Sequence, residues 1–118
     1  MSGNLKGSGG DIAPFSQSSF PWKKAVSAVF ITGTHVICST SCYLISENVN
    51  ADAANPGTAA FHDGQNLTGR LVWHDQALAN HAHGCCFKIP IYCDKGLTLV
   101  ATSVTNVAVQ WVPGPRLP

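Results

Sequence analysis

Apolar residues alternate with small polar residues in a series of short runs that begins near residue 25. In the first run Val26, Ala28 and Phe30 occupy every second position, and the turn residues Thr32 and Gly33 end the run. Alternation with a period of two is typical of a β-strand with one buried face. No window of the chain has the period of 3.6 residues that an amphipathic helix requires, so the pattern predicts β structure.

Similar segments recur along the chain, and residues common in turns separate them. The β-branched residues, which favour strands, are concentrated in these segments. About seven or eight short strands at this spacing predict an all-β fold, a single β-sandwich or jelly roll of antiparallel strands. The expected strands cover residues 26–31, 35–38, 42–45, 58–62, 71–74, 85–92, 97–101 and 107–111.

Turn residues predict how some of these strands are joined. Residues 53–57 contain the turn signal Asn-Pro-Gly. Residues 63–69 have the composition of a loop between two neighbouring strands. A short turn near Ser103 and Val104 predicts that the last two strands pair as a β-hairpin.

Three regions of different composition define the expected domain organisation. Residues 1–22 combine a Gly- and Ser-rich beginning with prolines and aromatic residues, residues 23–112 form the β-sandwich domain, and residues 113–118 are a Pro-rich tail. Aromatic side chains on a flexible segment are unfavourable unless they dock on a surface. The N-terminal region is therefore either an extended arm that docks on the body or on a neighbouring subunit, or a frayed terminus with one local aromatic contact.

The charge and composition of the chain exclude several classes of function. Hydrophobic residues make up 45% of the 118 residues, charged residues make up 11%, and the formal net charge is +1. A chain of this length buries a core, but this one lacks the positive field that attracts nucleic acid or anionic lipid. The longest nearly uncharged stretch, residues 25–43, is interrupted by polar residues and is too short for a membrane-spanning helix. So few charges predict a surface partly covered by other subunits.

The five cysteines predict buried free thiols rather than disulfides. They are Cys38, Cys42, Cys85, Cys86 and Cys93. An odd number with two adjacent members is a poor disulfide framework, and cysteine packs as a small hydrophobic residue. The first ten residues lack the apolar segment of a signal peptide, so we expect the thiols to reside in a reducing compartment.

The segment from His81 to Cys86 contains the candidates for metal binding. His81, His83 and Cys85 would share one face of a strand, and imidazole and thiolate are zinc ligands. The spacing matches no standard zinc motif, and Asn80 and Gly84 favour a polar loop that leads into a strand with buried thiols. We therefore expect no metal and no other cofactor. The three residues are the weak candidates for metal ligands that the sequence offers.

No arrangement typical of an enzyme stands out. The acidic residues lie mostly in predicted turns, where an aspartate caps backbone N–H groups. No paired carboxylates are evident, there is no glycine-rich phosphate loop, and no signature marks a cysteine that would act with a histidine as a nucleophile. We therefore expect a protein without catalytic activity.

Two regions resemble small β-sandwich virion structural proteins of tailed bacteriophages. In Ala59–Trp73 a strand ends in an Asp-Gly turn, and a Thr-Gly step leads to the next strand. In Phe87–Val100 a Pro-Ile … Lys-Gly-Leu strand pair follows, and the closing Val-x-Val-x-aromatic strand is Val107–Trp111. The resemblance covers residues 57–112 and departs from the family at residues 81–86, where a polar or small-residue loop is usual.

The resemblance implies a non-enzymatic capsid decoration (cement) protein, often a homotrimer, that binds the outside of the major capsid protein lattice and stabilises it. Such a protein is assembled in the host cytoplasm and resides on the capsid exterior of the virion. A small tail or head-fibre component is the alternative within the virion. Because aromatic anchors commonly dominate interface energetics, we expect the arm to supply the contacts. The expected interface residues are Phe15, Phe20, Trp22, Lys23 and Lys24.

Two other classes remain open. A β-sandwich of this size is also suited to a carbohydrate- or zinc-binding module, with Trp73, Tyr92 and Trp111 as a stacking face for sugars. Aromatic residues at alternating strand positions, however, more often belong to the core. A cytosolic cysteine enzyme is the remaining class, and rapid alkylation of a single thiol near neutral pH would indicate it.

Overall fold

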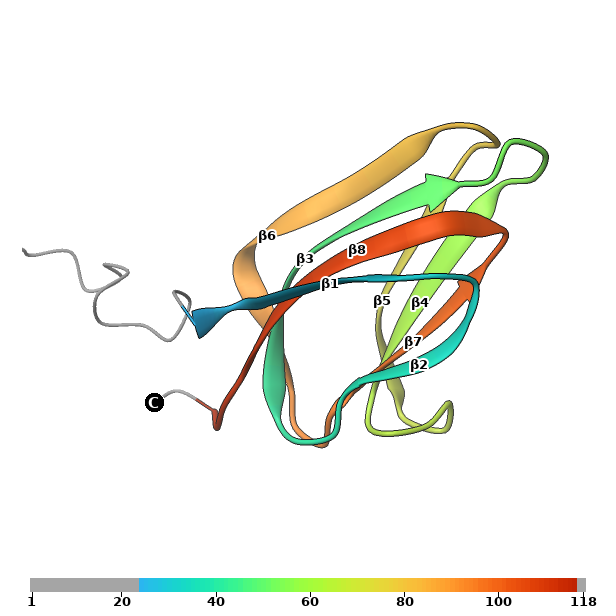
Figure 1. Cartoon of the computed structure of the whole chain (residues 1–118). Coiled ribbons are helices and arrows are strands. Elements are labelled where there is room, and N and C mark those ends of the chain that lie inside the picture. The colour runs from blue at the N-terminus through green and yellow to red at the C-terminus, as the bar shows by residue number, and fades with distance from the viewer. Residues whose placement is uncertain (1–23, 117–118) are drawn as a thin grey trace, which may run out of the picture.

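The computed structural model describes residues 24–116, which form two β-sheets packed face to face (Figure 1). All neighbouring strands in the two sheets are antiparallel. The strands are β1 (Val26–Phe30), β2 (Gly33–Cys38), β3 (Cys42–Ala51), β4 (Gly57–Asp63), β5 (Arg70–Ala77), β6 (Ala82–Cys93), β7 (Leu97–Thr102) and β8 (Val104–Pro113).

The strand order identifies the sandwich as a jelly roll. The first sheet has the order β1-β8-β3-β6 and the second has the order β2-β7-β4-β5. Two four-stranded sheets between which the chain repeatedly crosses are the arrangement of a jelly roll. The prediction of an all-β sandwich of antiparallel strands is therefore confirmed. No helix in residues 24–116 has the length and apolar character needed to cross a membrane.

The prediction that the last two strands form a hairpin is wrong. β7 pairs with β2 and β4, whereas β8 pairs with β1 and β3, so the two strands lie in different sheets. Ser103, with a φ of 52°, makes the corner between them. A corner and a hairpin turn both interrupt the alternation for one or two residues, so the pattern alone does not distinguish them. The predicted loop at residues 63–69, in contrast, does join two paired strands, β4 and β5, although Asp63 itself is the last residue of β4.

Inward-facing residues of both sheets meet in one hydrophobic core. Phe61 on β4 and Leu44 on β3 are the largest side chains without exposed surface. Burial of such a side chain contributes about 2–3 kcal/mol. Other members of the core are Val49, Leu97, Leu99, Val107, Val109 and Trp111.

Several strands are longer than the pattern predicts, among them β3 and β6. β3 continues to Ala51 instead of ending at Ile45. β6 begins at Ala82, so the expected polar loop before Cys85 is wrong. Asparagine and glycine have low strand propensity, but pairing with neighbouring strands overrides it here.

Gly84 explains why a polar loop was expected before Cys85, where the structure has a strand. It lies inside β6 opposite Asn48. A Cβ at this position would lie 2.6 Å from the Glu47 carbonyl oxygen and 2.7 Å from the Asn48 side chain. Gly84 is thus a point of close approach between β3 and β6, a role that glycine also has inside strands.

One turn and the C-terminal end of the described region are held by specific hydrogen bonds. The Asp52 carboxylate accepts backbone N–H groups of Ala54 and Asn55 at 2.9 and 2.7 Å, which forms the predicted turn at residues 53–57. After β8 ends, the Gly114 amide donates to the Ser41 carbonyl oxygen at 3.0 Å. The tail therefore leaves the ladder at the prolines, as their missing N–H groups require.

Candidate functional site

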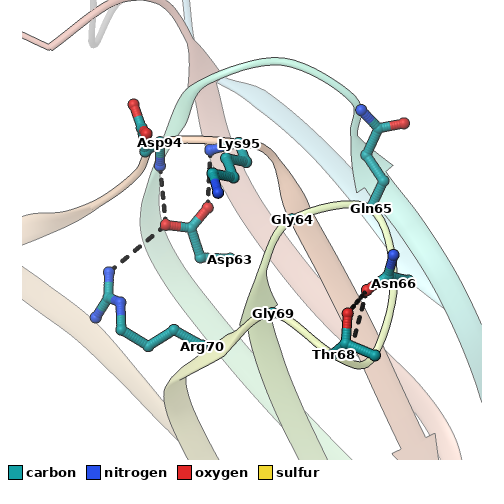
Figure 2. A pocket seen from close by; sticks show the side chains of 9 residues that line it. All are labelled: Asp63, Gly64, Gln65, Asn66, Thr68, Gly69, Arg70, Asp94 and Lys95. Carbon is teal, nitrogen blue, oxygen red and sulfur yellow. Dashed lines mark hydrogen bonds and ion pairs between the residues drawn. The ribbon is translucent and has the colours of Figure 1, made fainter.

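A polar depression of about 760 Å³ lies at one end of the sandwich (Figure 2). It is formed by the β4–β5 loop and by the connection between β6 and β7. The Asp63 carboxylate joins these two segments, because it accepts the backbone N–H groups of Asp94 at 3.0 Å and Lys95 at 2.8 Å. The Arg70 guanidinium adds an ion pair to the same carboxylate at 3.6 Å. The Asp63 carboxylate is thus occupied by backbone N–H groups, as expected for an aspartate in a turn.

The other side chains around this depression are not arranged like those of a catalytic site. The Asn66 side-chain oxygen accepts the Thr68 N–H and hydroxyl groups at 2.9 and 2.5 Å, so it stabilises the loop itself. Arg70 and Lys95 supply positive charge and Asp94 supplies one carboxylate at the rim. This mixture of exposed charges suits weak polar contacts, but it offers no paired acids or nucleophile.

A pair of buried carboxyl groups lies elsewhere, between the two sheets. Glu47 on β3 and Asp75 on β5 are 3% and 7% exposed, and their carboxyl groups lie against each other. Trp73 Nε1 donates to Glu47 Oε2 at 3.0 Å, and His83 Nδ1 lies 2.6 Å from Asp75 Oδ1. The expectation that no carboxylates are paired is therefore wrong. Residues 28 positions apart met because β3 and β5 face each other across the sandwich.

The two carboxyl groups differ in proton affinity. Burial, together with the adjacent Asp75 carboxyl group, raises the pKa of Glu47 to about 8, although the hydrogen bond from Trp73 opposes this shift. Burial favours a higher pKa for Asp75 as well, but the adjacent Glu47 carboxyl group and the contacts with the Gln76 amide and His83 lower its pKa below the ordinary value. Near neutral pH, Glu47 therefore carries a proton and Asp75 is ionised.

The candidate zinc ligands are not brought together. His83 binds Asp75, whereas His81 Nδ1 contacts the Ala79 carbonyl oxygen at 2.8 Å in the turn before β6. Cys85 is half-buried and lies opposite Glu47. Within residues 24–116 no group of three or more His, Cys, Asp or Glu side chains is arranged to hold a metal ion.

The five thiols fall into two groups. Cys38, Cys42 and Cys93 are buried, as predicted, and they lie at the same end of the core. Cys85 is only partly buried and Cys86 is exposed, so the prediction of buried thiols is wrong for this pair. Adjacent residues in a strand point to opposite faces, and β6 is an edge strand with little cover.

The three aromatic residues considered for sugar stacking do not share one surface. Trp111 is buried on β8. Trp73 packs edge-on against Phe87 with ring centroids 4.8 Å apart, and Tyr92 packs against Tyr43 at 5.0 Å. Their rings are thus occupied by intramolecular contacts, as the core interpretation predicts.

The outward surface of β1, β8 and β3 has no charged side chain. Register pairs run across it in two rows, Ser27–Gln110–Ser46 and Val29–Ala108–Asn48. Directly opposed residues of antiparallel strands project to the same side of the sheet, so each row lies on one face. The same six residues line a shallow depression of about 340 Å³. We call this surface the neutral face; its residues are Ser27, Val29, Ser46, Asn48, Ala108 and Gln110.

Two lateral edges of the sandwich expose large apolar side chains. On the side of β1 and β2, Val29, Ile31 and Val36 are more than half exposed. On the side of β5 and β6, the exposed apolar residues are Leu71, Leu78 and Ile89. Edge strands of monomeric proteins usually carry charges or prolines that block pairing with other chains. β6 has Lys88 and Pro90, whereas β1 and β2 have no charged residue or proline.

Most of the expected interface residues cannot be placed. Phe15, Phe20, Trp22 and Lys23 lie outside the described residues, and Lys24 is exposed just before β1. The docking of the N-terminal region stays a prediction from the sequence.

Comparison with known proteins gave no matching family model, no similar curated protein and no similar solved structure. The function must therefore be inferred from the surfaces and side-chain clusters of this chain.

Proposed function

We propose that the protein is a non-enzymatic structural component of a tailed-bacteriophage virion, a capsid decoration protein that binds the outside of the major capsid lattice. The observation that carries this proposal is the neutral face. A flat sheet surface of small uncharged side chains can be covered by another protein without burying an unpaired charge. The interior of protein interfaces is likewise depleted of charged residues.

The neutral face also defines the chemistry of its partner. Because it presents amide and hydroxyl groups and small apolar groups, the complementary capsid surface should be uncharged too. Burial of an opposing Asp or Lys there would cost several kcal/mol without a partner. Binding through this face is therefore expected to depend little on ionic strength, unlike binding through a charged patch.

The apolar edges support assembly into a homotrimer. The β1–β2 edge and the β5–β6 edge lie on opposite sides of the sandwich and have different sequences. A ring of identical subunits needs two different complementary surfaces on each subunit, whereas a two-fold dimer needs only one surface that matches itself. We propose that the β1–β2 edge of one copy contacts the β5–β6 edge of the next, with three copies closing the ring.

The positions of the titratable groups support a non-catalytic role. Glu47 and Asp75 are buried against each other between the two sheets, and Asp63 binds backbone amides. A general acid or base must reach a substrate, directly or through one water. The jelly-roll fold is common in viral capsid proteins and lectins, so it is compatible with the proposal but does not specify it.

The copy number of the protein in purified virions tests the proposal. Quantitative mass spectrometry of particles from the phage that encodes this sequence should find copies on the order of hundreds, in a fixed ratio to the major capsid protein. A handful of copies per particle would instead favour the tail or head-fibre alternative. Absence from the particle would exclude a virion role.

A further inference from the structure

Cys42 and Cys93 are directly opposite each other on neighbouring antiparallel strands. Cys42 is the first residue of β3, Cys93 is the last residue of β6, and the two are register partners. Neither side chain has exposed surface. Because opposed residues project to the same side of a sheet, both sulfur atoms point into the core.

The backbone geometry of such a pair matches that of a disulfide. Opposed residues of antiparallel strands have Cα atoms about 4.5 or 5.5 Å apart, depending on the type of pair. Disulfides usually span Cα separations of about 4.4–6.8 Å. Both kinds of pair fall in this range, so a bond does not require either strand to move far. We propose that Cys42 and Cys93 form a reversible oxidation site, at which an intramolecular disulfide joins β3 to β6.

Cys38 is the nearest competing thiol, but its placement favours the other pair. It lies on β2, in the opposite sheet, where its register partner is Leu97. Its thiol donates to the Thr40 carbonyl oxygen at 3.3 Å. Cys38 is close enough to raise the pKa of Cys42, but it reaches Cys42 from the other sheet, whereas Cys93 is the register partner of Cys42 within the sheet.

The surroundings of the two thiols give them different acidities. Interaction with Cys93, burial and the neighbouring Cys38 raise the pKa of Cys42 far above its ordinary value. Interaction with Cys42 lowers the pKa of Cys93, against the effect of burial. Cys93 is therefore the group that more readily becomes a thiolate and attacks an oxidant.

The reaction is an exchange with a low-molecular-weight disulfide such as oxidised glutathione. The Cys93 thiolate attacks one sulfur of the oxidant, whose S–S bond breaks, and one glutathione leaves as a thiol. Cys42 then gives up its proton, and its sulfur displaces the second glutathione from Cys93. The two cysteines lose two electrons and two protons in total, and one glutathione disulfide becomes two glutathione molecules.

The position of β6 explains how an oxidant reaches a buried thiol. β6 is an edge strand that is hydrogen-bonded within its sheet to β3 alone. Opening of the end of an edge strand needs less free energy than opening of a central strand. Once formed, the disulfide prevents this opening and closes a loop of roughly fifty residues, which restricts the unfolded chain.

The test is disulfide mapping of the full-length protein. The protein is incubated with excess oxidised glutathione near pH 8, alkylated with iodoacetamide in denaturant, and digested with trypsin without reduction. Cleavage after Lys and Arg yields residues 25–70, with Cys38 and Cys42, and residues 89–95, with Cys93 as the single cysteine. We expect these two peptides to be cross-linked, and the thermal midpoint of the oxidised protein to rise by roughly 10 °C.

Serine variants assign the bond. Cys38→Ser should retain the cross-link and the rise in thermal midpoint, and Cys42→Ser should lose both. A cross-link that persists in Cys42→Ser, cross-links confined to Cys85 and Cys86, or oxidised protein in which every thiol is still alkylated would each overturn the inference. Because the cross-linked peptides are detected in the unsubstituted protein, the result does not depend on whether Cys42→Ser folds.

Discussion

Glu47 and Asp75 come from opposite sheets, and their buried carboxyl groups lie against each other inside the sandwich. One of the two carboxyl groups must carry a proton, and it is Glu47, whose pKa burial raises to about 8. Trp73 is hydrogen-bonded to Glu47, and His83 on the edge strand β6 is hydrogen-bonded to Asp75. The pair ties β3 to β5 only while that proton is present, so it makes stability depend on pH.

We predict that the protein becomes less stable as the pH rises from 6 to 9. Glu47 binds a proton in the folded state up to a pH of about 8, whereas in the unfolded state its pKa is near 4.5. Its contribution is therefore complete below pH 4.5 and is lost progressively as the pH approaches 8. The expected loss is about 2–3 kcal/mol, or roughly 8–12 °C in thermal midpoint by calorimetry.

Glu47→Gln provides the matched control for this prediction. The glutamine amide can still donate to Asp75 and accept from Trp73, but it does not titrate. The variant should have a nearly constant midpoint between pH 6 and 9, a range in which Asp75 stays ionised in both states. An equal decline in Glu47→Gln and in the unsubstituted protein would show that another group causes it.

Gly69→Ala should destabilise the protein strongly. A Cβ at this position would lie 1.8 Å from the Asp63 carbonyl oxygen, which is backbone and cannot turn away. The loop and the β4–β5 ladder would have to shift, so we expect a loss of about 2–4 kcal/mol in the free energy of unfolding.

Chemical denaturation measures this loss, and Leu67→Ala in the same loop is the control. Leu67 is 50% exposed, and a surface substitution of this kind usually changes stability by about 0.5 kcal/mol or less. Similar midpoints for the two variants would mean that the loop is more adaptable than its contacts indicate.

Asn48→Lys should abolish capsid binding without unfolding the protein. Asn48 is exposed on β3, where it ends one of the two rows of the neutral face. If another protein covers this face, the lysine charge is buried without a partner, and we expect binding to weaken by about 100-fold or more. Co-sedimentation with purified capsids measures the effect.

Ala53→Lys is the control for that experiment. Ala53 is exposed in the turn between β3 and β4, so the same charge is added outside the neutral face and outside both apolar edges. It should leave capsid binding and the thermal midpoint close to those of the unsubstituted protein. Normal binding by Asn48→Lys would remove the neutral face from the proposed interface.

Deletion of residues 1–22 should lower the occupancy of the capsid and the temperature at which the protein is released from it. The expected cause is the loss of Phe15, Phe20 and Trp22, because aromatic anchors commonly contribute 2 kcal/mol or more, by rough estimate, to an interface. Replacing these three residues with alanine in the full-length chain separates anchoring from arm length. Unchanged occupancy in both variants would remove the arm from the mechanism.

Most strands could be predicted from the sequence, and the exceptions have a common cause. Val26 to Phe30 alternate cleanly and form β1. The alternating pattern in the second half of β3 was obscured by the polar residues Glu47, Asn48 and Asn50. Val49 and Ala51 still occupy every second position there. A bulge in β3 between Leu44 and Ser46 shifts the alternation by one residue, so the two halves do not read as one strand.

The buried acid pair could not be predicted from the pattern of hydrophobic and polar residues. Asp75 directly follows His74 in a polar stretch, where a turn interpretation is reasonable. Glu47 is the partner of Asp75 only because β3 and β5 face each other across the sandwich. The one local signal was the alternation of Trp73, Asp75 and Ala77, which places Asp75 on the inward face of the strand.

The sequence alone determined the fold class, the turn at residues 53–57, the loop after β4 and the scarcity of charge, because each depends on neighbours along the chain. Which strands share a sheet, which carboxyl group retains a proton and which thiols lie opposite each other were decided only by the tertiary structure. Those properties depend on strand register and burial, and both arise from contacts between residues that are far apart in the chain.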